Sequence, residues 1–276
     1  MTPELAELGF VLAGAGLVAG VLAGLFGIGG GTVLVPAILF ALVAESYPFE
    51  ITTHVAIATS LAVIVPTGIS SARAHHKRGG VDWSIVRRWV PGLALGAVAG
   101  GAIAQQASPT SLRALFAVIV LLVAARLLTK AALDFGRALP ESAFTNGLMA
   151  FIISGVSAAM GAGGGGLTVP TLLGFRVPAQ RAVGTASANG IFIALVGCLT
   201  FALTAPTPEA APPGTVGYLN VPAALVLGVV TPLAAPVGAV LAHRLPPKLL
   251  QRAFAAYLLV IATLMLRPIV SAWVAP

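Results

Sequence analysis

The sequence predicts an all-α polytopic membrane protein. Of its 276 residues, 58% are hydrophobic and 8% are charged, whereas a soluble domain carries roughly a quarter charged residues. Its mean hydropathy is +1.01. Uncharged runs approach or exceed the roughly 20 residues that a helix needs to cross a bilayer, and they cover residues 8–44, 55–72, 89–112 and 182–208. These observations exclude an ordinary water-soluble enzyme.

The charged residues indicate no nucleic-acid partner. Fifteen Lys and Arg against eight Asp and Glu give a net charge of +7, but such an excess in a membrane protein usually lies on cytoplasmic loops. The single cysteine, Cys198, lies in an apolar run and has neither a disulfide partner nor metal-ligand spacing. We interpret it as a packing residue, and we expect no metal and no other cofactor. Because Glu4 and Glu7 replace the basic region of a secretory signal, we expect the first apolar segment to remain in the mature protein.

A glycine-rich motif occurs twice. Gly-Ile-Gly-Gly-Gly-Thr-Val-Leu-Val-Pro at residues 27–36 matches Gly-Ala-Gly-Gly-Gly-Gly-Leu-Thr-Val-Pro at residues 161–170. A weaker match follows each copy, Ala-Ile-Ala-Thr-Ser at 56–60 and Ala-Val-Gly-Thr-Ala at 182–186. We therefore divide one integral membrane domain into three parts: a first repeat (1–130), a cytoplasmic linker (131–141) and a second repeat (142–276).

Loop charges predict that the two repeats have opposite orientations. Residues 73–88 hold five bases and one acid, so this loop is expected in the cytoplasm. The equivalent residues 206–218 contain Glu209 and no base, as is typical of an external loop. Two similar halves in opposite orientation form the inverted-repeat arrangement of secondary transporters.

Each repeat is predicted to begin with a re-entrant hairpin broken at the glycines. In the second repeat, residues 166–174 provide only nine residues after the break, or roughly 14 Å at about 1.5 Å per residue, which is half of a hydrocarbon core of about 30 Å. In the first repeat, residues 8–26 and 31–44 flank the glycines in the same way. We expect three transmembrane helices after each hairpin and both chain termini outside.

The glycine motifs are candidate anion sites. Glycine costs about 1 kcal/mol relative to alanine inside a helix, and irregular backbone at membrane depth occurs where it is buried in protein or lines a polar cavity. A turn that opens a short helix presents unpaired N–H groups and the positive end of the helix dipole, and both favour an anion. Two such turns from opposite faces can enclose an oxyanion near the midplane.

The candidate site joins these glycines to polar side chains on the helices that follow. Hydroxyl and amide groups there can donate hydrogen bonds to sulfite or sulfonate oxygens. The predicted substrate-binding residues are Gly27, Gly29, Gly30, Gly31, Thr32, Thr59, Ser60, Gly161, Gly163, Gly164, Gly165, Gly166, Thr185, Ser187 and Asn189. Pro36 and Pro170 are predicted to be structural.

Other interpretations of the same residues stay open. Small residues also allow close helix packing, which accounts for Gly92, Gly96 and Gly100, so Gly96→Ala is expected to affect transport only mildly. Ser and Thr in helices often bond their own i−4 carbonyl. A dinucleotide fingerprint is not expected, because it needs a preceding strand.

We predict no enzymatic activity. Gly-Val-Ser-Ala at residues 155–158 resembles a nucleophile motif, but an intramembrane serine protease needs a histidine at the same depth, and the four histidines lie at span ends or in loops. No acid falls inside a predicted span, so carboxylate-based proton coupling is not expected. The coupling ion, and roles for His54, Arg126 and Arg267, are left open.

With these motifs in both halves, the chain resembles the sulfite exporter TauE/SafE permease family. The resemblance implies a multi-pass secondary transporter of the inner (cytoplasmic) membrane for a small sulfur-containing anion such as sulfite, thiosulfate or an organosulfonate. Nothing in the composition points to sulfur itself. The alternatives are a small-anion channel and a non-transporting membrane scaffold. The expected partners are the anion, the lipid bilayer and, as an option, a second copy of the chain.

Overall fold

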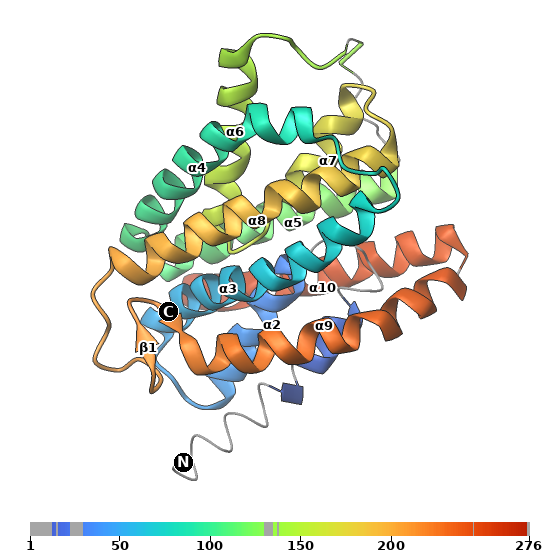
Figure 1. Cartoon of the computed structure of the whole chain (residues 1–276). Helices are drawn as coiled ribbons and strands as arrows, with labels where there is room; N and C mark the ends of the chain where they lie inside the picture. The colour runs from blue at the N-terminus through green and yellow to red at the C-terminus, as the bar shows by residue number, and fades with distance from the viewer. Residues whose placement is uncertain are drawn as a thin grey trace.

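The computed structural model describes residues 13–14, 16–22, 30–129, 135–136, 138–244 and 246–274 (Figure 1). The predicted site residues Gly27 and Gly29 lie outside these ranges, as does part of the predicted linker. The described elements, in chain order, are α2 (Gly31–Ala44), α3 (Phe49–His76), α4 (Trp83–Gln106), α5 (Pro109–Thr129), α6 (Ala143–Ala159), α7 (Gly165–Gly174), α8 (Ala179–Leu203), β1 (Thr215–Val216), β2 (Leu219–Asn220), α9 (Val221–Arg244) and α10 (Pro247–Val274).

The described chain is an all-α membrane protein with one small addition. Three helical segments are both long and apolar enough to cross a bilayer, namely α3, residues Pro109–Arg126 of α5, and α8. The helices α4 and α9 have 24 residues each and α10 has 28, so each is longer than the roughly 20 residues that a span requires. The addition is an antiparallel pair of two-residue strands, β1 and β2, in the loop before α9.

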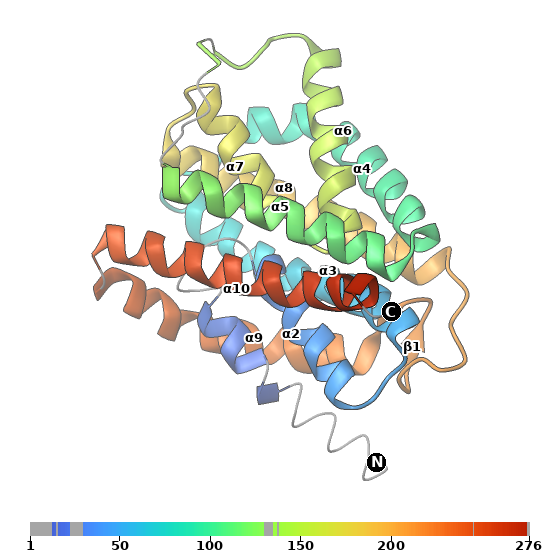
Figure 2. The same ribbon diagram turned by 180° about the vertical axis from the view of Figure 1, so that it is seen from behind.

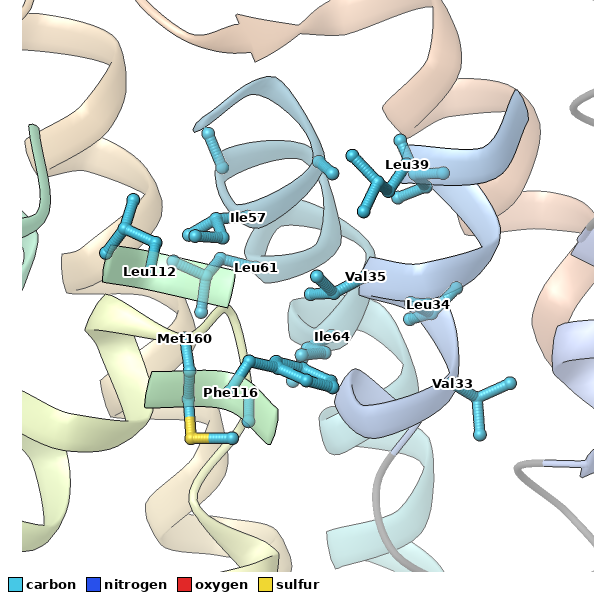
Figure 3. Close-up of a cluster of buried hydrophobic side chains, with 14 of the residues drawn as sticks. Val33, Leu34, Val35, Leu39, Ile57, Leu61, Ile64, Leu112, Phe116 and Met160 are labelled. Atoms are coloured by element: carbon cyan, nitrogen blue, oxygen red, sulfur yellow. The ribbon is translucent and has the colours of Figure 1, made fainter. Parts of the chain in front are cut away.

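The two helices that follow the glycine motifs are short. α2 has 14 residues and α7 has 10, which at about 1.5 Å per residue gives roughly 21 Å and 15 Å. Both lengths fall below a hydrocarbon core of about 30 Å, as the predicted hairpins require. α2 is apolar on nearly all sides, as is typical of a helix that other parts of the protein surround. Its side chains pack against α3, α5 and the residue after α6 (Figure 3). The labelled members of this cluster are Val33, Leu34, Val35, Leu39, Ile57, Leu61, Ile64, Leu112, Phe116 and Met160.

Helices from the two halves of the chain are interleaved. α3 packs against α8 near the centre, α5 against α10, and α9 against α3, while α4 lies between α6 and α8 (Figures 1 and 2). The residues that follow α3 and α8 therefore meet elements from the opposite half. Cys198 of α8 is a buried free thiol, in agreement with its interpretation as a packing residue.

The glycines of α4 have a packing role. A Cβ on Gly96 would collide with the carbonyl oxygen of Phe151 in α6, and Gly92 and Gly100 face other α6 carbonyls in the same way. This contact confirms the close-packing interpretation. It also shows that alanine at Gly96 would displace backbone of α6, whereas the mild effect of Gly96→Ala on transport stays a prediction.

Candidate functional site

The two glycine motifs form the same backbone turn. Gly30 (φ 80°, ψ −24°) precedes α2, and Gly164 (φ 76°, ψ −9°) precedes α7. Each carbonyl accepts a hydrogen bond from the N–H four residues later, Leu34 in one turn and Thr168 in the other, at 2.8 Å in both. This left-handed conformation costs a non-glycine residue roughly 1–2 kcal/mol. Gly30 and Gly164 are therefore glycines because their turns require the left-handed conformation.

Each turn leaves backbone donors free. The first N–H groups of an α-helix have no intrahelical acceptor, and those of Gly31 and Thr32, and of Gly165 and Gly166, have no backbone partner among the described residues. Neither helix start has a side-chain cap. These unpaired N–H groups and the positive helix ends form an environment that favours an anion.

The two turns contact each other in the folded protein. A Cβ built on Gly31 would lie 2.6 Å from Cα of Ala162 and 3.0 Å from the carbonyl oxygen of Gly161. Ser60 of α3 reinforces the contact, because its hydroxyl donates to the carbonyl oxygen of Gly161 at 3.0 Å. The amino-terminal ends of α2 and α7 thus lie within a few residues of each other.

Unpartnered polar side chains surround the second turn. Ser157, Thr168 and Asn189 are each at most 1% exposed, yet the two hydroxyls and both amide atoms of Asn189 have no hydrogen-bond partner. A Cβ on Gly164 would lie 3.5 Å from Oγ1 of Thr168 and 3.6 Å from Oγ of Ser157, so both hydroxyls face the turn. The hydroxyl of Thr32 is also buried and unpartnered. Since buried polar groups are almost always paired, this cluster is suited to a polar ligand.

Two small cavities border the same turn. One, of about 50 Å³, lies between α3, α7 and α8 and is lined by Gly163, Gly165, Thr67, Ser71 and Ser187 among others. The other, of about 20 Å³, is lined by residues 163–166 together with Thr32 and Ser157. A water molecule needs roughly 10–15 Å³ by this measure, so the first cavity has room for a group of a few heavy atoms.

The described acids leave the two helix ends without negative charge. Each of them lies in a loop or at a helix terminus, and they are Glu45, Glu50, Asp82, Glu141 and Glu209. Two adjacent positive helix ends without a carboxylate among the described residues make an electropositive region at membrane depth. A bound anion would neutralise it.

Comparison with known proteins shows the family of the chain. A sequence profile described as "Sulfite exporter TauE/SafE" matches residues 12–265. The chain belongs to the sulfite exporter TauE/SafE family. A "Probable membrane transporter protein" of Haemophilus influenzae is 31% identical over 90% of this chain and 94% of its own length. The "Probable membrane transporter protein YunE" of Bacillus subtilis is 30% identical over 67% of this chain and 73% of its own length.

A more distant relative extends the comparison to archaea. A probable membrane transporter protein of Methanocaldococcus jannaschii is 26% identical over 91% of this chain and 92% of its own length. No solved structure matches the chain significantly. TauE/SafE is a family of membrane transporters and not an enzyme family, so the chain is a membrane transporter.

Within this TauE/SafE protein, the predicted site residues Thr59 and Thr185, like Ser60, have structural hydrogen bonds. The hydroxyl of Thr59 accepts a hydrogen bond from the N–H of Asn220 at 3.2 Å, and that of Thr185 accepts one from the N–H of Asp82 at 2.9 Å. Asn220 and Asp82 immediately precede α9 and α4. Each threonine therefore holds the start of a helix from the opposite half, and we leave both out of the proposed site.

Of the remaining predicted polar residues, Ser187 has hydrogen bonds within the protein and Asn189 has none. Ser187 lines the larger cavity, but its hydroxyl donates to the carbonyl oxygen of Val183 at 3.0 Å, the i−4 bond that was the alternative for such residues. It also accepts a hydrogen bond from the hydroxyl of Ser71 at 3.0 Å. Asn189 keeps both amide atoms free, and a Cβ on its neighbour Gly190 would meet the carbonyl oxygen of Gly163 in the second motif.

The prolines of the two motifs lie inside the short helices. Pro36 and Pro170 are each six residues after the left-handed glycine of their turn. Proline lacks an N–H, so Pro36 leaves the carbonyl of Thr32 without its helical donor. The hydroxyl of Tyr257 from α10 donates to this carbonyl at 3.4 Å, which links α10 to the first turn.

Sequence reasoning missed Ser157 and Thr168 as members of the polar cluster. Ser157 was considered only as a nucleophile, and Thr168 has no hydroxyl counterpart in the first motif, where Leu34 stands. The side chain of His54 lies elsewhere, since its Nε2 bonds the carbonyl oxygens of Ala104 and Ala107 at 3.1 and 3.2 Å. Among the described residues, the hydroxyl of Ser157 has no hydrogen-bond partner, and so no histidine to activate it.

Proposed function

We propose that this TauE/SafE protein is a secondary transporter that moves a small sulfur-containing anion, such as sulfite, thiosulfate or an organosulfonate, across the cytoplasmic membrane. The observation that carries the proposal is the contact between the two glycine turns at Gly31 and Ala162. This contact places two uncapped helix starts together where the described chain provides no carboxylate. The family profile supports sulfite or a related anion as the cargo.

The chemistry of the cluster suits an oxyanion. The N–H groups of Gly165 and Gly166, the hydroxyls of Ser157 and Thr168 and the amide of Asn189 can each donate to one of several oxygens. These donors are dipoles and carry no formal charge. They therefore stabilise an anion less than a buried lysine or arginine would, and a carrier must also release its substrate.

The repeated turns support an inverted-repeat architecture for the carrier. Gly30 and Gly164 share one conformation, and Thr59 and Thr185 make equivalent bonds to helix starts in the opposite half. In this arrangement residues 73–88 face the cytoplasm and residues 206–218 face outward. Binding between the repeats near the midplane is the usual design of such transporters.

A binding screen tests the proposed cargo. The purified protein is heated in the presence of sulfite, thiosulfate, sulfoacetate, taurine or sulfate, with chloride at equal ionic strength as the reference. A ligand of the folded state at 100 times its Kd stabilises by about 2.7 kcal/mol, which raises the thermal midpoint. We expect at least one sulfur anion to raise the midpoint. If none exceeds chloride, the proposed cargo is wrong.

Uptake into proteoliposomes separates a carrier from a channel. A carrier binds each substrate molecule during its cycle, so the initial rate should saturate with anion concentration. A rate that stays proportional to concentration well above the apparent Kd from the thermal screen would favour the small-anion channel.

A further inference from the structure

A cavity lies along the carboxyl half of α3. It has a volume of about 680 Å³ and is lined by Pro66, Ile69, Ser70, Arg73, Ala74, Lys77 and Arg78. Beside it, α3 and α9 diverge towards their carboxyl ends in both views (Figures 1 and 2). The surrounding loop is the strongly basic one that charge distribution places in the cytoplasm.

The equivalent place in the other half is closed. There, α4 lies against the carboxyl end of α8, and the side-chain amide of Gln105 donates to the carbonyl oxygen of Thr200 at 3.2 Å and to the hydroxyl of Thr204 at 3.0 Å. A Cβ on Gly101 would lie 3.1 Å from Cγ2 of Thr200. These two helix ends are therefore in direct contact.

The threonine bonds establish which positions correspond. Thr59 holds the start of α9 as Thr185 holds the start of α4, so α3 with α9 is the counterpart of α8 with α4. Ala74 follows Thr59 at the same sequence distance at which Thr200 follows Thr185. Ala74 is exposed in the cavity, whereas Thr200 is buried beneath α4. Corresponding positions are thus open at one end of the molecule and closed at the other.

We propose that this cavity is the cytoplasmic entrance to the glycine turns, held open in this structure, and that Arg73 and Lys77 draw the transported anion into it; the anionic nature of the cargo rests on the proposed function. Both bases are exposed, lie one helical turn apart and line the cavity. A cleft that carries charge of one sign raises the local concentration of the opposite ion by roughly 10- to 1,000-fold.

The inner end of the cavity lies close to the candidate site. Pro66 and Ser70 line the cavity, while their neighbours Thr67 and Ser71, together with Ile64, line the smaller cavity beside the second turn. Cβ atoms built on Gly31 and Gly163 would lie 3.0 Å and 2.8 Å from side-chain carbons of Ile64. The two cavities therefore lie on adjoining faces of one stretch of α3, and an anion that enters beside Lys77 has to pass from one face to the other to reach the turns.

Thiol labelling tests the open entrance. Single cysteines at Ala74 and Thr200, each with Cys198→Ala, are treated in sided vesicles with a membrane-impermeant methanethiosulfonate. We expect Ala74→Cys to react from the cytoplasmic side and Thr200→Cys to resist reaction from the external side. Ser70→Cys, also exposed, provides a second reporter if Ala74→Cys fails to insert. Unreactive reporters at both positions would mean that lipid or protein fills the cavity, and fast external reaction at Thr200→Cys would mean that both ends are open.

The role of the two bases is tested with a pair of reagents of opposite charge. Sulfonatoethyl and trimethylammonioethyl methanethiosulfonate are compared at Ala74→Cys. At low salt, Arg73→Gln with Lys77→Gln should lower the rate ratio of the anionic to the cationic reagent by roughly 10-fold, and added salt should reduce the difference. Arg87→Gln with Arg88→Gln removes the same charge from exposed positions outside the cavity and should change the ratio much less.

An equal effect of the two double variants would overturn the recruiting role. Repeating the reaction in vesicles with and without anionic lipid separates a soluble anion from a lipid headgroup, because a headgroup that occupies the cavity would protect Ala74→Cys only where anionic lipid is present. Such protection would also contradict the proposal that the cavity is an entrance for the transported anion. None of these rates depends on which anion is transported, so a failed sulfur-anion screen and a closed entrance remain distinguishable.

Discussion

Gly31 of the first glycine motif lies directly against Ala162 of the second, so closely that a methyl group on Gly31 would come within 2.6 Å of the Ala162 Cα. The two residues are remote in sequence, and each directly follows a left-handed glycine, Gly30 or Gly161. Their contact makes one site from two motifs.

Replacing either left-handed glycine should abolish transport. Alanine at Gly30 or Gly164 would be strained by roughly 1–2 kcal/mol at positive φ, and a Cβ on Gly164 would also collide with the side chain of Ile193. Either change rotates the free N–H groups away from a shared ligand. We expect uptake to fall at least tenfold in both variants while membrane abundance is preserved.

Gly147→Ala in α6 is the matched control for these variants. A Cβ there meets nothing within 4 Å, and the residue is already helical. Uptake should stay close to the parental rate. Parental uptake and anion binding by either Gly30→Ala or Gly164→Ala would contradict the two-turn site and return the glycines to a packing role.

Asn189→Leu should separate binding from stability. Because both amide atoms are buried without partners, an apolar side chain of similar size removes a desolvation cost and should leave the thermal midpoint equal or higher. The midpoint shift caused by the anion should shrink markedly, since one donor is lost.

Asn146→Leu is the contrasting variant. Its amide is equally buried but fully bonded, because Oδ1 accepts from Nε1 of Trp89 at 2.9 Å and Nδ2 donates to the carbonyl oxygens of Pro140 and Ser142. This change should lower stability by about 1–3 kcal/mol. Two results would contradict a ligand-binding role for Asn189. One is an equal loss of stability in the two variants, and the other is an anion-induced rise in the thermal midpoint of Asn189→Leu as large as in the parent.

Thr59→Val and Thr185→Val should lower stability without changing anion affinity. Each substitution keeps the shape of the side chain but leaves a backbone N–H, of Asn220 or Asp82, without its acceptor. An unpaired buried donor costs about 1–3 kcal/mol. Thr263→Val, whose hydroxyl is exposed and bonds only its own helix, provides the baseline. A loss of anion affinity with unchanged stability would instead indicate that the two threonines bind the anion.

Asp82 should make a pH-dependent contribution at the start of α4. The hydroxyl of Ser84 holds the pKa of this carboxyl below its usual value, and the N–H groups of Ile85 and Ser84 and the positive charge of Arg181 act in the same direction. Because the pKa is lower in the folded state, the ionised carboxyl stabilises the protein at pH values above its pKa in the unfolded chain, about 3.9. This contribution to stability is lost as the pH falls through the pKa of the folded state.

The measurement compares the parent with Asp82→Ala. At pH 7 the loss of the cap should cost about 1 kcal/mol. The difference in thermal midpoint should persist down to about pH 5 and shrink as the pH falls below about 4. A difference that grows on acidification would show that the carboxyl is stabilised in its protonated form instead.

Labelling from the two sides of the membrane tests the orientation. Arg88 and Glu209 are both exposed, and cysteines at these positions, with Cys198→Ala, should react with an impermeant reagent from opposite sides. Arg88→Cys still leaves four bases in its loop, so the topological signal is kept. Reaction of both from the same side would rule out the inverted arrangement.

The class of the fold was predictable from local properties. Apolar composition and the length of uncharged runs determine that helices cross a membrane, since a bilayer leaves few other ways to pair the backbone. The motif at residues 161–170 also indicated a break before a helix of nine residues, and the structure has Gly165–Gly174 there. Backbone conformation at a glycine is a local property, so repeated glycines predicted repeated turns.

The roles of the polar residues were decided only by the tertiary structure. The sequence placed Thr59, Thr185 and Asn189 in one candidate site, yet the two threonines bond helix starts that are more than 100 residues away in the chain, while Asn189 stays unpartnered. A hydroxyl or amide carries no mark in the sequence of which distant N–H it will meet. That choice depends on how helices from opposite halves interleave, and the same packing brings Ser157 and Thr168 to Gly164.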